Sequence, residues 1–251
     1  MQGKYRASSA TFLVEGPQAI REVLASAWPV IDLFVTGSAA ARYPELVESA
    51  RKLGSPVHLC DAGALASLTD TKSSQELVAV VESDRPDLRE VIIHGVRLVA
   101  GLVDCNDPGN LGSVIRVADA AGVTAVVLTP DSVDRTNPKA VRASTGSLFH
   151  LPVVPEIPWQ QLCHDARAVG LQVLATTGDP DATDLDELSD SGRLLPPTLW
   201  LFGTEAHGLP TEVLAAADVR VRIPLHGRAE SLNLAAAAAV CLYASAKAQR
   251  S

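Results

Sequence analysis

The stretch from Asp107 to Gly122, DPGNLGSVIRVADAAG, combines residue types and spacings that could bind an anion. A Pro-Gly turn brings Asn110 to the start of a predicted helix, where an asparagine can act as the N-cap. Apolar residues then recur with helical spacing, and Arg116 falls between them, so it should point away from the buried face. Backbone N–H groups at a helix N-terminus can bind a phosphate. The simpler interpretation, a capped helix with a solvated arginine, stays open.

A second candidate segment is LFGTEAHGLP, residues 201–210, in which a predicted buried strand runs into a glycine-broken turn. Gly203 and Gly208 would let backbone groups approach a ligand closely, and Glu205 lies between them. Taken alone, this segment also fits a plain strand-to-helix turn.

The third segment is RIPLHGRAESLNLAAAAA, residues 222–239, where Pro224 ends a predicted strand. Ser231 is expected to cap the closing helix, with Leu232 and Asn233 in its first turn. Ligand sites in open α/β sheets gather at the carboxyl ends of strands, so the three segments together predict one site.

Several other kinds of site are not supported. The chain has neither a G-x-G-x-x-G dinucleotide motif nor a G-x-x-x-x-G-K-[ST] phosphate loop, and no G-x-S-x-G nucleophile elbow. Its cysteines, Cys60, Cys105, Cys163 and Cys241, are scattered without a C-x-x-C pair, so no metal site is predicted and reduced thiols are expected.

The elements that must position these segments alternate between strands and helices, which predicts a mainly parallel sheet. An N-terminal α/β unit is expected to end near Val81, and the polar segment 83–90 is interpreted as a linker. The predicted domains are residues 1–84 and 91–251. In the second domain, strands are expected near 98–103, 125–128, 173–176, 199–202 and 219–223, and the acidic segment from 179 to 190 is predicted to be a loop.

The order N-L-G-x-x-x-R, then L-F-G-x-E-x-x-G-L, then I-P-L-x-G-x-x-E-S-L-N resembles the three motifs of SpoU-type (TrmH-like) RNA 2′-O-ribose methyltransferases of the SPOUT superfamily. The resemblance covers roughly residues 98–246 and includes KAVRASTGSLFHLPV at 139–153. Less specifically, FLVEGPQAIREVL at 12–24 is similar to the small substrate-binding domain that precedes some catalytic domains of this family. Residues 73–76, SSQE, stand where some relatives have a Gln-Gly pair.

The resemblance implies a fold and a cofactor. The fold is an α/β, trefoil-knotted parallel-sheet catalytic domain preceded by a small α/β domain similar to a ribosomal-protein RNA-binding fold. The cofactor is S-adenosylmethionine, with Gly203, Ile223 and Leu232 at matching contact positions and Leu225 nearby. Apolar walls with main-chain groups suit an adenine ring.

The resemblance also implies a catalytic set of Arg116, Asn110, Glu205, Ser231 and Asn233. Arg116 is the family's proposed activator of the ribose hydroxyl. Because a guanidinium is effectively always protonated, we expect it to bind the adjacent phosphate and stabilise the developing alkoxide. Glu205 and Asn233 would hold Arg116 and the pocket loops, and Asn110 would position its own turn.

Related enzymes are homodimers in which this arginine can act at the partner's pocket. We therefore expect a homodimer through the catalytic domain, with Tyr243 and the closing helix contributing.

Charge and composition limit the partners. The net charge of −8 argues against a generic nucleic-acid binder, but six acidic residues fall between 179 and 190. Arg135, Lys139 and Arg142 form a small basic cluster that either contacts RNA phosphates or is a solvated face. No signal-peptide pattern occurs and no apolar run reaches the roughly 18 residues of a membrane span, so a cytoplasmic protein without membrane contact is expected.

Three functions follow from these observations. The leading one is methylation of ribosomal RNA, which rests by analogy on the extra N-terminal domain. A tRNA 2′-O-ribose methyltransferase is the alternative within enzymes. A non-catalytic RNA-binding relative is the third, and the presence of Asn110, Arg116, Glu205 and Asn233 counts against it.

Overall fold

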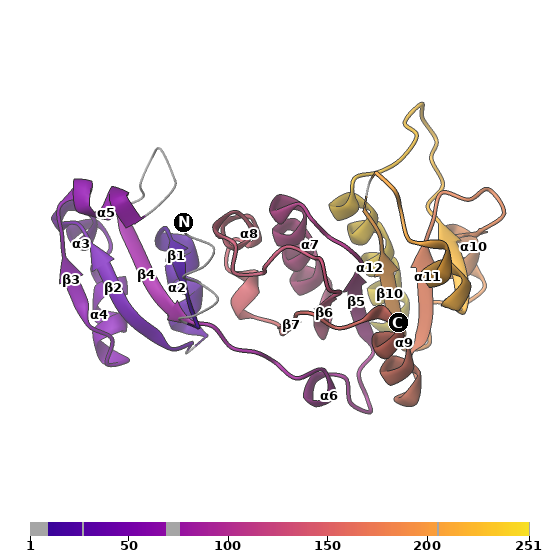
Figure 1. The fold of residues 1–251 in the computed structure, drawn as a ribbon, viewed down its shortest axis with the longest axis horizontal. Helices are drawn as coiled ribbons and strands as arrows, with labels where there is room; N and C mark the ends of the chain where they lie inside the picture. The colour runs from indigo at the N-terminus through magenta and orange to yellow at the C-terminus, as the bar shows by residue number, and fades with distance from the viewer. Residues whose placement is uncertain (1–9, 27, 69–75, 205, 251) are drawn as a thin grey trace. The chain divides into compact units, whose positions relative to one another are not determined.

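The computed structural model describes residues 10–26, 28–68, 76–204 and 206–250 of the 251-residue chain. It contains two compact units (Figure 1). The first comprises the chain up to Asp84 together with Thr136–His150, and the second comprises Arg85–Arg135 and Leu151 onward.

The first unit is built on a four-stranded sheet in the order β1-β4-β2-β3. Strands β1 and β2 each pair antiparallel with β4, whereas β3 pairs parallel with β2. The strands are β1 (Thr11–Glu15), β2 (Val30–Val35), β3 (Val57–Leu59) and β4 (Leu77–Glu82), and the helices are α2 (Pro17–Ala25), α3 (Gly37–Arg42), α4 (Pro44–Lys52) and α5 (Ala62–Leu68). The predicted N-terminal α/β unit is thus present.

One helix of this unit was not predicted. Helix α3 begins after Thr36, whose Oγ1 accepts a 3.2 Å hydrogen bond from the backbone N of Ala39. It ends at Tyr43, where Pro44 starts α4 with a proline in its first turn. Local sequence patterns do not reveal α3, because it buries only one residue, Ala39, and therefore has no apolar stripe.

A segment from between two strands of the second sheet completes the first unit. Helix α8 (Pro138–Ser144) and the 3-10 turn η1 (Ser147–Phe149) pack on this unit. The Phe149 ring stacks on Phe12 at a centroid distance of 6.3 Å and meets Trp28 edge-on at 5.2 Å. Arg142 Nη1 lies 3.3 Å from Glu15 Oε1, so this arginine is ion-paired within the unit and does not present an unpaired cation to RNA.

The second unit is built on a seven-stranded parallel sheet in the order β7-β6-β5-β10-β8-β11-β9. Its central strands are buried on both faces, which explains why they read as continuous apolar runs. The strands are β5 (Leu98–Leu102), β6 (Ala125–Leu128), β7 (Val153–Val154), β8 (Gln172–Thr176), β9 (Thr183–Asp184), β10 (Thr198–Phe202) and β11 (Val219–Arg222). The predicted parallel sheet is confirmed.

Helices cover both faces of this sheet. Side chains alternate along β10, so Leu199 and Leu201 join the core on one face, which α6, α9 and α11 also build. On the other face, Trp200 Nε1 donates a 2.9 Å hydrogen bond to Ser245 Oγ of α12, and α12 packs along α7. The helices are α6 (Leu88–Val91), α7 (Pro108–Ala121), α9 (Trp159–Ala168), α10 (Leu185–Asp190), α11 (Thr211–Ala216) and α12 (Leu234–Arg250).

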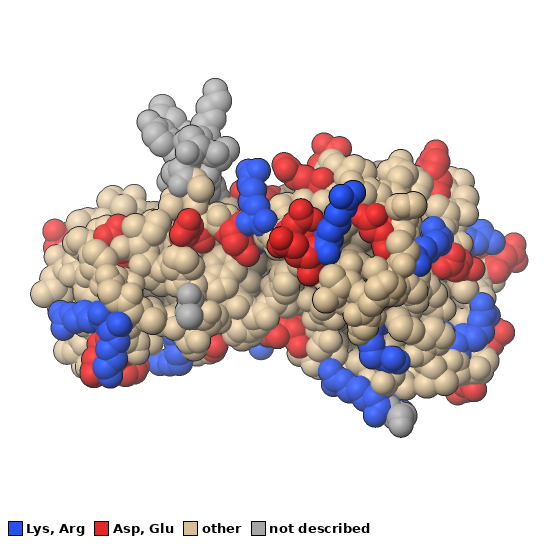
Figure 2. All heavy atoms as spheres, turned by 90° about the horizontal axis from the view of Figure 1, so that it is seen from below, with Lys and Arg blue, Asp and Glu red and all other residues tan. Residues whose placement is uncertain are grey.

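Two loop predictions were wrong. Within the expected linker, Leu88 starts α6 and is buried in the core of the second unit. The acidic segment contains β9 and α10, whose Leu185 and Leu188 are buried, so acidic residues occupy only its outer face. Ion pairs from Asp179 to Arg220 and from Asp184 to Arg222 neutralise part of this charge. On the face shown in Figure 2, acidic and basic side chains are mixed.

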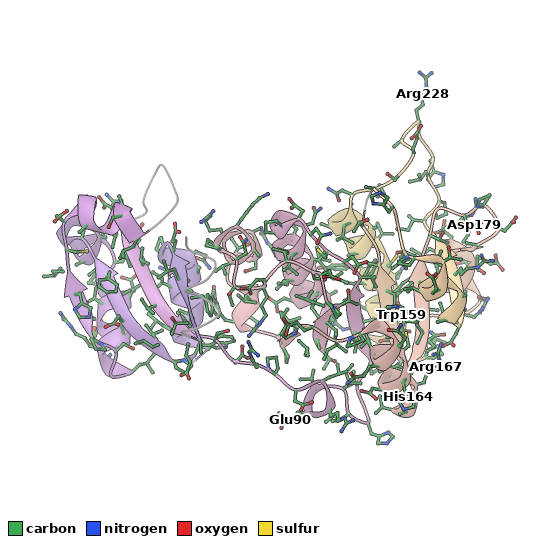
Figure 3. The ribbon with its side chains drawn as sticks, in the orientation of Figure 1. Glu90, Trp159, His164, Arg167, Asp179 and Arg228 are labelled. Carbon is green, nitrogen blue, oxygen red and sulfur yellow. The ribbon has the colours of Figure 1, made fainter. Side chains whose placement is uncertain are left out.

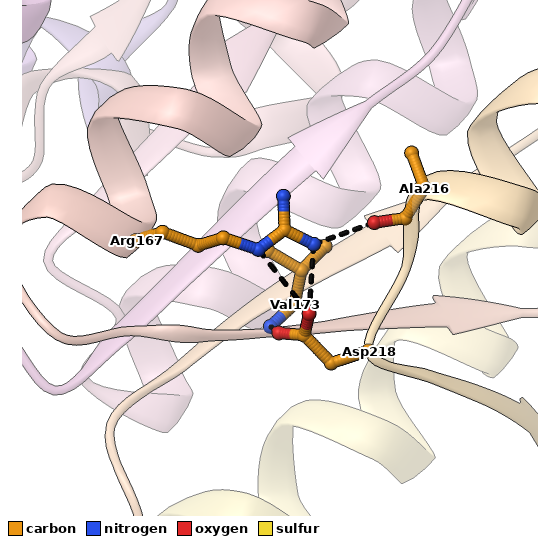
Figure 4. Close-up of polar contacts among 4 residues, drawn as sticks. All are labelled: Arg167, Val173, Ala216 and Asp218. Carbon is orange, nitrogen blue, oxygen red and sulfur yellow. Dashed lines mark hydrogen bonds and ion pairs between the residues drawn. The ribbon is translucent and has the colours of Figure 1, made fainter.

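A polar cluster joins three elements at the amino end of the parallel strands (Figure 4). Asp218 Oδ1 accepts hydrogen bonds from Arg167 Nη2 at 2.8 Å and from Nε at 3.2 Å, while its Oδ2 accepts a 2.7 Å bond from the backbone N of Val173. Arg167 also donates to the carbonyl of Ala216. Because this cluster satisfies its own polar groups, it stabilises the edge of the sheet opposite to the pocket described below.

Candidate active site

A pocket of about 400 Å³ opens at the carboxyl ends of three neighbouring strands, β10, β8 and β11. This volume falls within the range typical of small-molecule sites. Its lining comes from three short segments, from one residue of α11 and from the start of α12: Thr176, Thr177, Gly178, Phe202, Gly203, Thr204, His207, Gly208, Leu209, Leu214, Val221, Ile223, Leu225, Glu230, Ser231, Leu232, Leu234 and Ala237. Adjacent strand ends therefore gather the second and third sequence segments, as predicted.

The turn after β10 depends on its two glycines. Gly208 N donates a 2.8 Å hydrogen bond to the carbonyl of Thr204, and Gly208 has a φ of 65°, which favours glycine. A Cβ added at Gly203 would lie 2.2 Å from the carbonyl carbon and oxygen of Gly208. The turn can fold back on the end of β10 only because residue 203 has no side chain. Glu205, predicted to be part of the site, lies outside the described residues.

The segment after β11 forms the second wall. Ile223, Leu225 and Leu232 line the pocket together with Ser231. Helix α12 begins at Leu234, and Asn233 caps it by accepting a 2.7 Å hydrogen bond from the backbone N of Ala236. Our assignment of Ser231 as the cap was therefore wrong, because the helix starts later than the run of apolar residues suggests. Ser231 is an exposed residue of the pocket lining, and Asn233 is not in that lining.

The end of β8 supplies a third wall that the sequence analysis missed. Thr176, Thr177 and Gly178 follow the strand directly and line the pocket. Thr176 Oγ1 donates a 3.2 Å hydrogen bond to the carbonyl of Leu201, which links β8 to β10 beside the pocket. The sequence did contain a signal for this wall, because a polar, glycine-containing run directly follows a predicted strand. Neighbouring parallel strands end at the same edge of a sheet, so such a run can join a site formed by other strand ends.

Helix α7, which carries the first segment, begins earlier than predicted. Its N-cap is Asp107, whose side chain accepts a 2.8 Å hydrogen bond from the backbone N of Asn110. Asn110 therefore lies within the first turn, with Pro108 at its beginning, and the assignment of Asn110 as N-cap was wrong. Gly122, with a φ of 71°, ends the helix in the left-handed conformation.

Arg116 lies on the exposed face of α7, as its spacing predicted. Among the residues that the structure describes, its guanidinium has no hydrogen-bond or ion-pair partner. Neither Arg116 nor Asn110 is in the lining of the pocket. The single chain thus brings Gly203, Ile223, Leu232 and Ser231 together, while Arg116 and Asn110 lie on a separate helix.

The described lining of the pocket presents no lysine or arginine side chain to a ligand. The ionisable side chains of this described lining are those of Glu230 and His207. Phe202, Ile223 and Leu232 provide apolar walls, while the threonines supply hydroxyl groups. Such a site suits a flat apolar group held beside a cation, because no fixed positive charge opposes it.

The described residues contain no group of three or more His, Cys, Asp or Glu side chains arranged to hold a metal ion. The four cysteines are not bonded to one another, and burial raises the pKa of the Cys163 and Cys241 thiols. No helix in the described part of the chain is long and apolar enough to cross a membrane.

Comparison with known proteins places this pocket in a family. The sequence pattern of the SpoU rRNA methylase family matches residues 97–243, and that of the RNA 2′-O ribose methyltransferase substrate-binding domain matches residues 13–86. The chain is 33% identical to the 23S rRNA (guanosine(2553)-2′-O)-methyltransferase RlmP of Bacillus subtilis, over 96% of this chain and 90% of the relative. It is 34% identical to the 23S rRNA (uridine(2479)-2′-O)-methyltransferase of Streptomyces viridochromogenes, over 95% and 83%.

The fold agrees with these sequence relationships. The crystal structure of the SpoU methyltransferase AviRb from Streptomyces viridochromogenes, in complex with the cofactor AdoMet, superimposes with a TM-score of 0.85. The two proteins are 31% identical, and the match covers all of this chain and 94% of that one. The chain therefore belongs to the SpoU family of RNA 2′-O-ribose methyltransferases.

Proposed function

We propose that this chain transfers a methyl group from S-adenosylmethionine to the 2′-hydroxyl of a ribose in ribosomal RNA. One observation carries the proposal. Gly203, Ile223 and Leu232, which the family motifs place at the cofactor, come from two separate segments and line one pocket at adjacent strand ends.

S-adenosylmethionine is the methyl donor of this family, and the residues present fit it. The adenine ring would lie against Ile223 and Leu232, and backbone groups of the turn after Gly203 would hydrogen-bond to its edge. When bound, the cofactor supplies an electrophilic methyl group on a positively charged sulfur. A pocket whose described lining has no lysine or arginine tolerates that charge, and the absence of a side chain at Gly203 preserves the narrow turn.

Arg116 is proposed to act on the RNA and not on the cofactor. Its guanidinium stays protonated, so it can bind the phosphate next to the target ribose and stabilise the oxyanion that develops at the 2′-oxygen. Its exposure and its lack of a partner among the described residues leave it available for this role. Because it is not in the pocket lining of its own chain, we propose that it reaches the pocket of a second copy.

A homodimer through the catalytic domain would provide that second copy. Helix α12 packs beside α7 and carries two exposed apolar side chains, Val240 and Tyr243, with exposed fractions of 42% and 51%. Aromatic residues are enriched at protein interfaces. Mixing Arg116→Ala protomers with Gly203→Val protomers tests this arrangement. Recovery of methyl transfer in the mixture supports action across the interface, and no recovery from two soluble, exchanging proteins contradicts it.

The other motif positions are given supporting roles. Asn233 holds the start of α12, and with it the pocket wall, through its cap. Ser231 presents its hydroxyl at the pocket, Asn110 shapes the first turn of α7, and Glu205 is proposed to hold Arg116. The trefoil knot implied by the resemblance stays a prediction.

Ribosomal RNA is proposed as the substrate because of the first unit. Residues 13–86 match the substrate-binding pattern, and the two relatives named above, both 23S rRNA methyltransferases, match along nearly the whole chain. This substrate would place the protein in the cytoplasm.

The decisive test is incubation of the full chain with tritiated S-adenosylmethionine and either 23S rRNA transcript or a total tRNA preparation. We expect label in 23S rRNA, at a nucleotide whose 2′-O-methyl group protects the adjacent bond from alkaline cleavage. Label in tRNA alone would favour the tRNA alternative. No label in either RNA, together with no binding of S-adenosylmethionine at near-millimolar concentration, would support a non-catalytic RNA-binding protein.

A further inference from the structure

We infer that Arg228 contacts a phosphate of the RNA strand beside the target ribose; this inference rests on the proposed function. Arg228 lies in the loop between β11 and α12, two residues before Glu230 and three residues after Leu225. Both of these neighbours line the pocket, so the loop that carries Arg228 starts and ends at the pocket wall.

The loop projects from the second unit, and its arginine is at the far end. Figure 3 shows Arg228 at the tip, with its side chain extending outward. Arg228 is exposed, and it has no hydrogen-bond or ion-pair partner among the described residues. Two residues of extended chain span at most about 7 Å, so its backbone stays within that distance of Glu230. An RNA strand that passes along this loop to the pocket would come within reach of the side chain.

Arg228 differs from most other arginines of the second unit in having no partner among the described residues. Most other arginines near the sheet are already engaged within the protein: Arg167 with Asp218, Arg220 with Asp179, Arg222 with Asp184, Arg97 with the carbonyl of Leu195 and Arg250 with the carbonyl of Ala121. A chain with a net charge of −8 must still bring polyanionic RNA to a pocket whose described lining has no cation. Arg228 provides a cation on the loop whose two ends line that pocket.

Phosphate binding by one arginine has a measurable signature. Each phosphate contact on a single strand steepens the dependence of log K on log salt by about 0.7, which corresponds to about fourfold in affinity at roughly 0.15 M salt. A phosphate contact does not depend on the base sequence of the RNA. Its loss should therefore weaken the binding of RNA fragments of different sequence by the same factor. Binding of S-adenosylmethionine should not change, because Arg228 is not in the pocket lining.

The test compares Arg228→Ala with Arg193→Ala in the full chain. Arg193 is also exposed, its side chain also has no partner among the described residues, and it precedes β10, at the sheet edge opposite to the pocket. A fragment of 23S rRNA carrying the mapped methylation site is the probe, and binding is measured between roughly 0.05 and 0.3 M salt. Calorimetry with S-adenosylmethionine is run on each protein.

We expect Arg228→Ala to weaken RNA binding about fourfold at roughly 0.15 M salt and to flatten the salt slope by about 0.7. Arg228→Lys should keep most of the slope, and Arg193→Ala should match wild type. An unchanged slope for Arg228→Ala, or an equal loss of cofactor affinity, would overturn the inference. Failure of the proposed function would look different, because the wild-type chain would then not methylate 23S rRNA.

Discussion

Gly203 lies so close to Gly208 that a Cβ on the first would be 2.2 Å from the carbonyl of the second. Carbon atoms in normal contact are about 3.5–4.0 Å apart, so any side chain at position 203 must push the turn away from β10. The same turn forms one wall of the pocket. The shape of the pocket therefore depends directly on this pair of glycines.

We predict that Gly203→Ala lowers the affinity for S-adenosylmethionine at least tenfold and destabilises the fold by about 1–3 kcal/mol, the usual cost of overpacking. Calorimetry measures the first effect and urea unfolding the second. Gly227→Ala is the matched control, because a Cβ there meets nothing within 4 Å. Normal cofactor binding by Gly203→Ala would show that the turn does not shape the site.

Asn233 combines a structural role with a proposed functional one, and substitution can separate the two. Asn233→Ala removes the cap of α12 and should cost about 1 kcal/mol in unfolding free energy. Asn233→Ser should restore most of that stability, since serine is also a good cap. If Asn233→Ser also restores full methyl transfer, the residue is needed only as a cap. Low activity in the stable Asn233→Ser protein would indicate a further role at the pocket.

The aromatic cluster of the first unit gives a third prediction. Phe149 is buried between Phe12 and Trp28, although it lies outside residues 1–84 in sequence. Phe149→Ala should destabilise this unit by about 3–5 kcal/mol in urea unfolding. His150→Ala removes a partly exposed contact between its Nε2 and Glu22 Oε2 and should cost less than about 1 kcal/mol. Equal effects of the two substitutions would contradict the anchoring role of Phe149.

The buried thiol of Cys241 predicts a loss of stability in alkali. Burial raises the pKa of this thiol in the folded state, whereas in the unfolded chain it is about 8.5. As pH rises above that value, the unfolded state ionises and the folded state does not, so the unfolding free energy falls. From pH 7.5 to 9.5 the loss should be about 1.4 kcal/mol for this group.

Urea unfolding of wild type and Cys241→Ala at both pH values tests this prediction. The variant should start less stable, because it leaves a cavity, yet lose less stability between the two pH values. Identical pH dependence in the two proteins would show that Cys241 does not contribute.

How much of this structure the sequence could predict varies with the kind of residue. The strands β5, β6 and β10 were found because strands buried on both faces read as apolar runs. Helix α10 was missed because Leu185 and Leu188 are too few to form a visible stripe among acidic residues. Both helix starts were misplaced, since Asp107 and Asn233 were each one of several residues able to cap.

Pocket residues could be predicted where a sequence motif contains them. They could not be predicted where only the order of the strands brings them to the pocket. Gly203, Ile223 and Leu232 belong to segments that stand out as broken strand ends, and they line the pocket. Thr176 and Thr177 join them only because β8 lies between β10 and β11, an order that local patterns do not encode. For the same reason, the packing of Phe149 on the first unit could not be foreseen.

We propose that Arg116 acts on the RNA while the pocket binds the cofactor, and a paired measurement on Arg116→Ala separates these two roles. Methyl transfer to 23S rRNA and the affinity for S-adenosylmethionine are measured on the same protein. We predict that transfer falls at least a hundredfold, as when a group that stabilises a developing oxyanion is removed. Cofactor affinity should stay within about twofold of wild type, because Arg116 is proposed to act on the RNA and not on the cofactor, and it is outside the pocket lining of its own chain. A collapse of cofactor affinity, or transfer at the wild-type rate, would contradict this account.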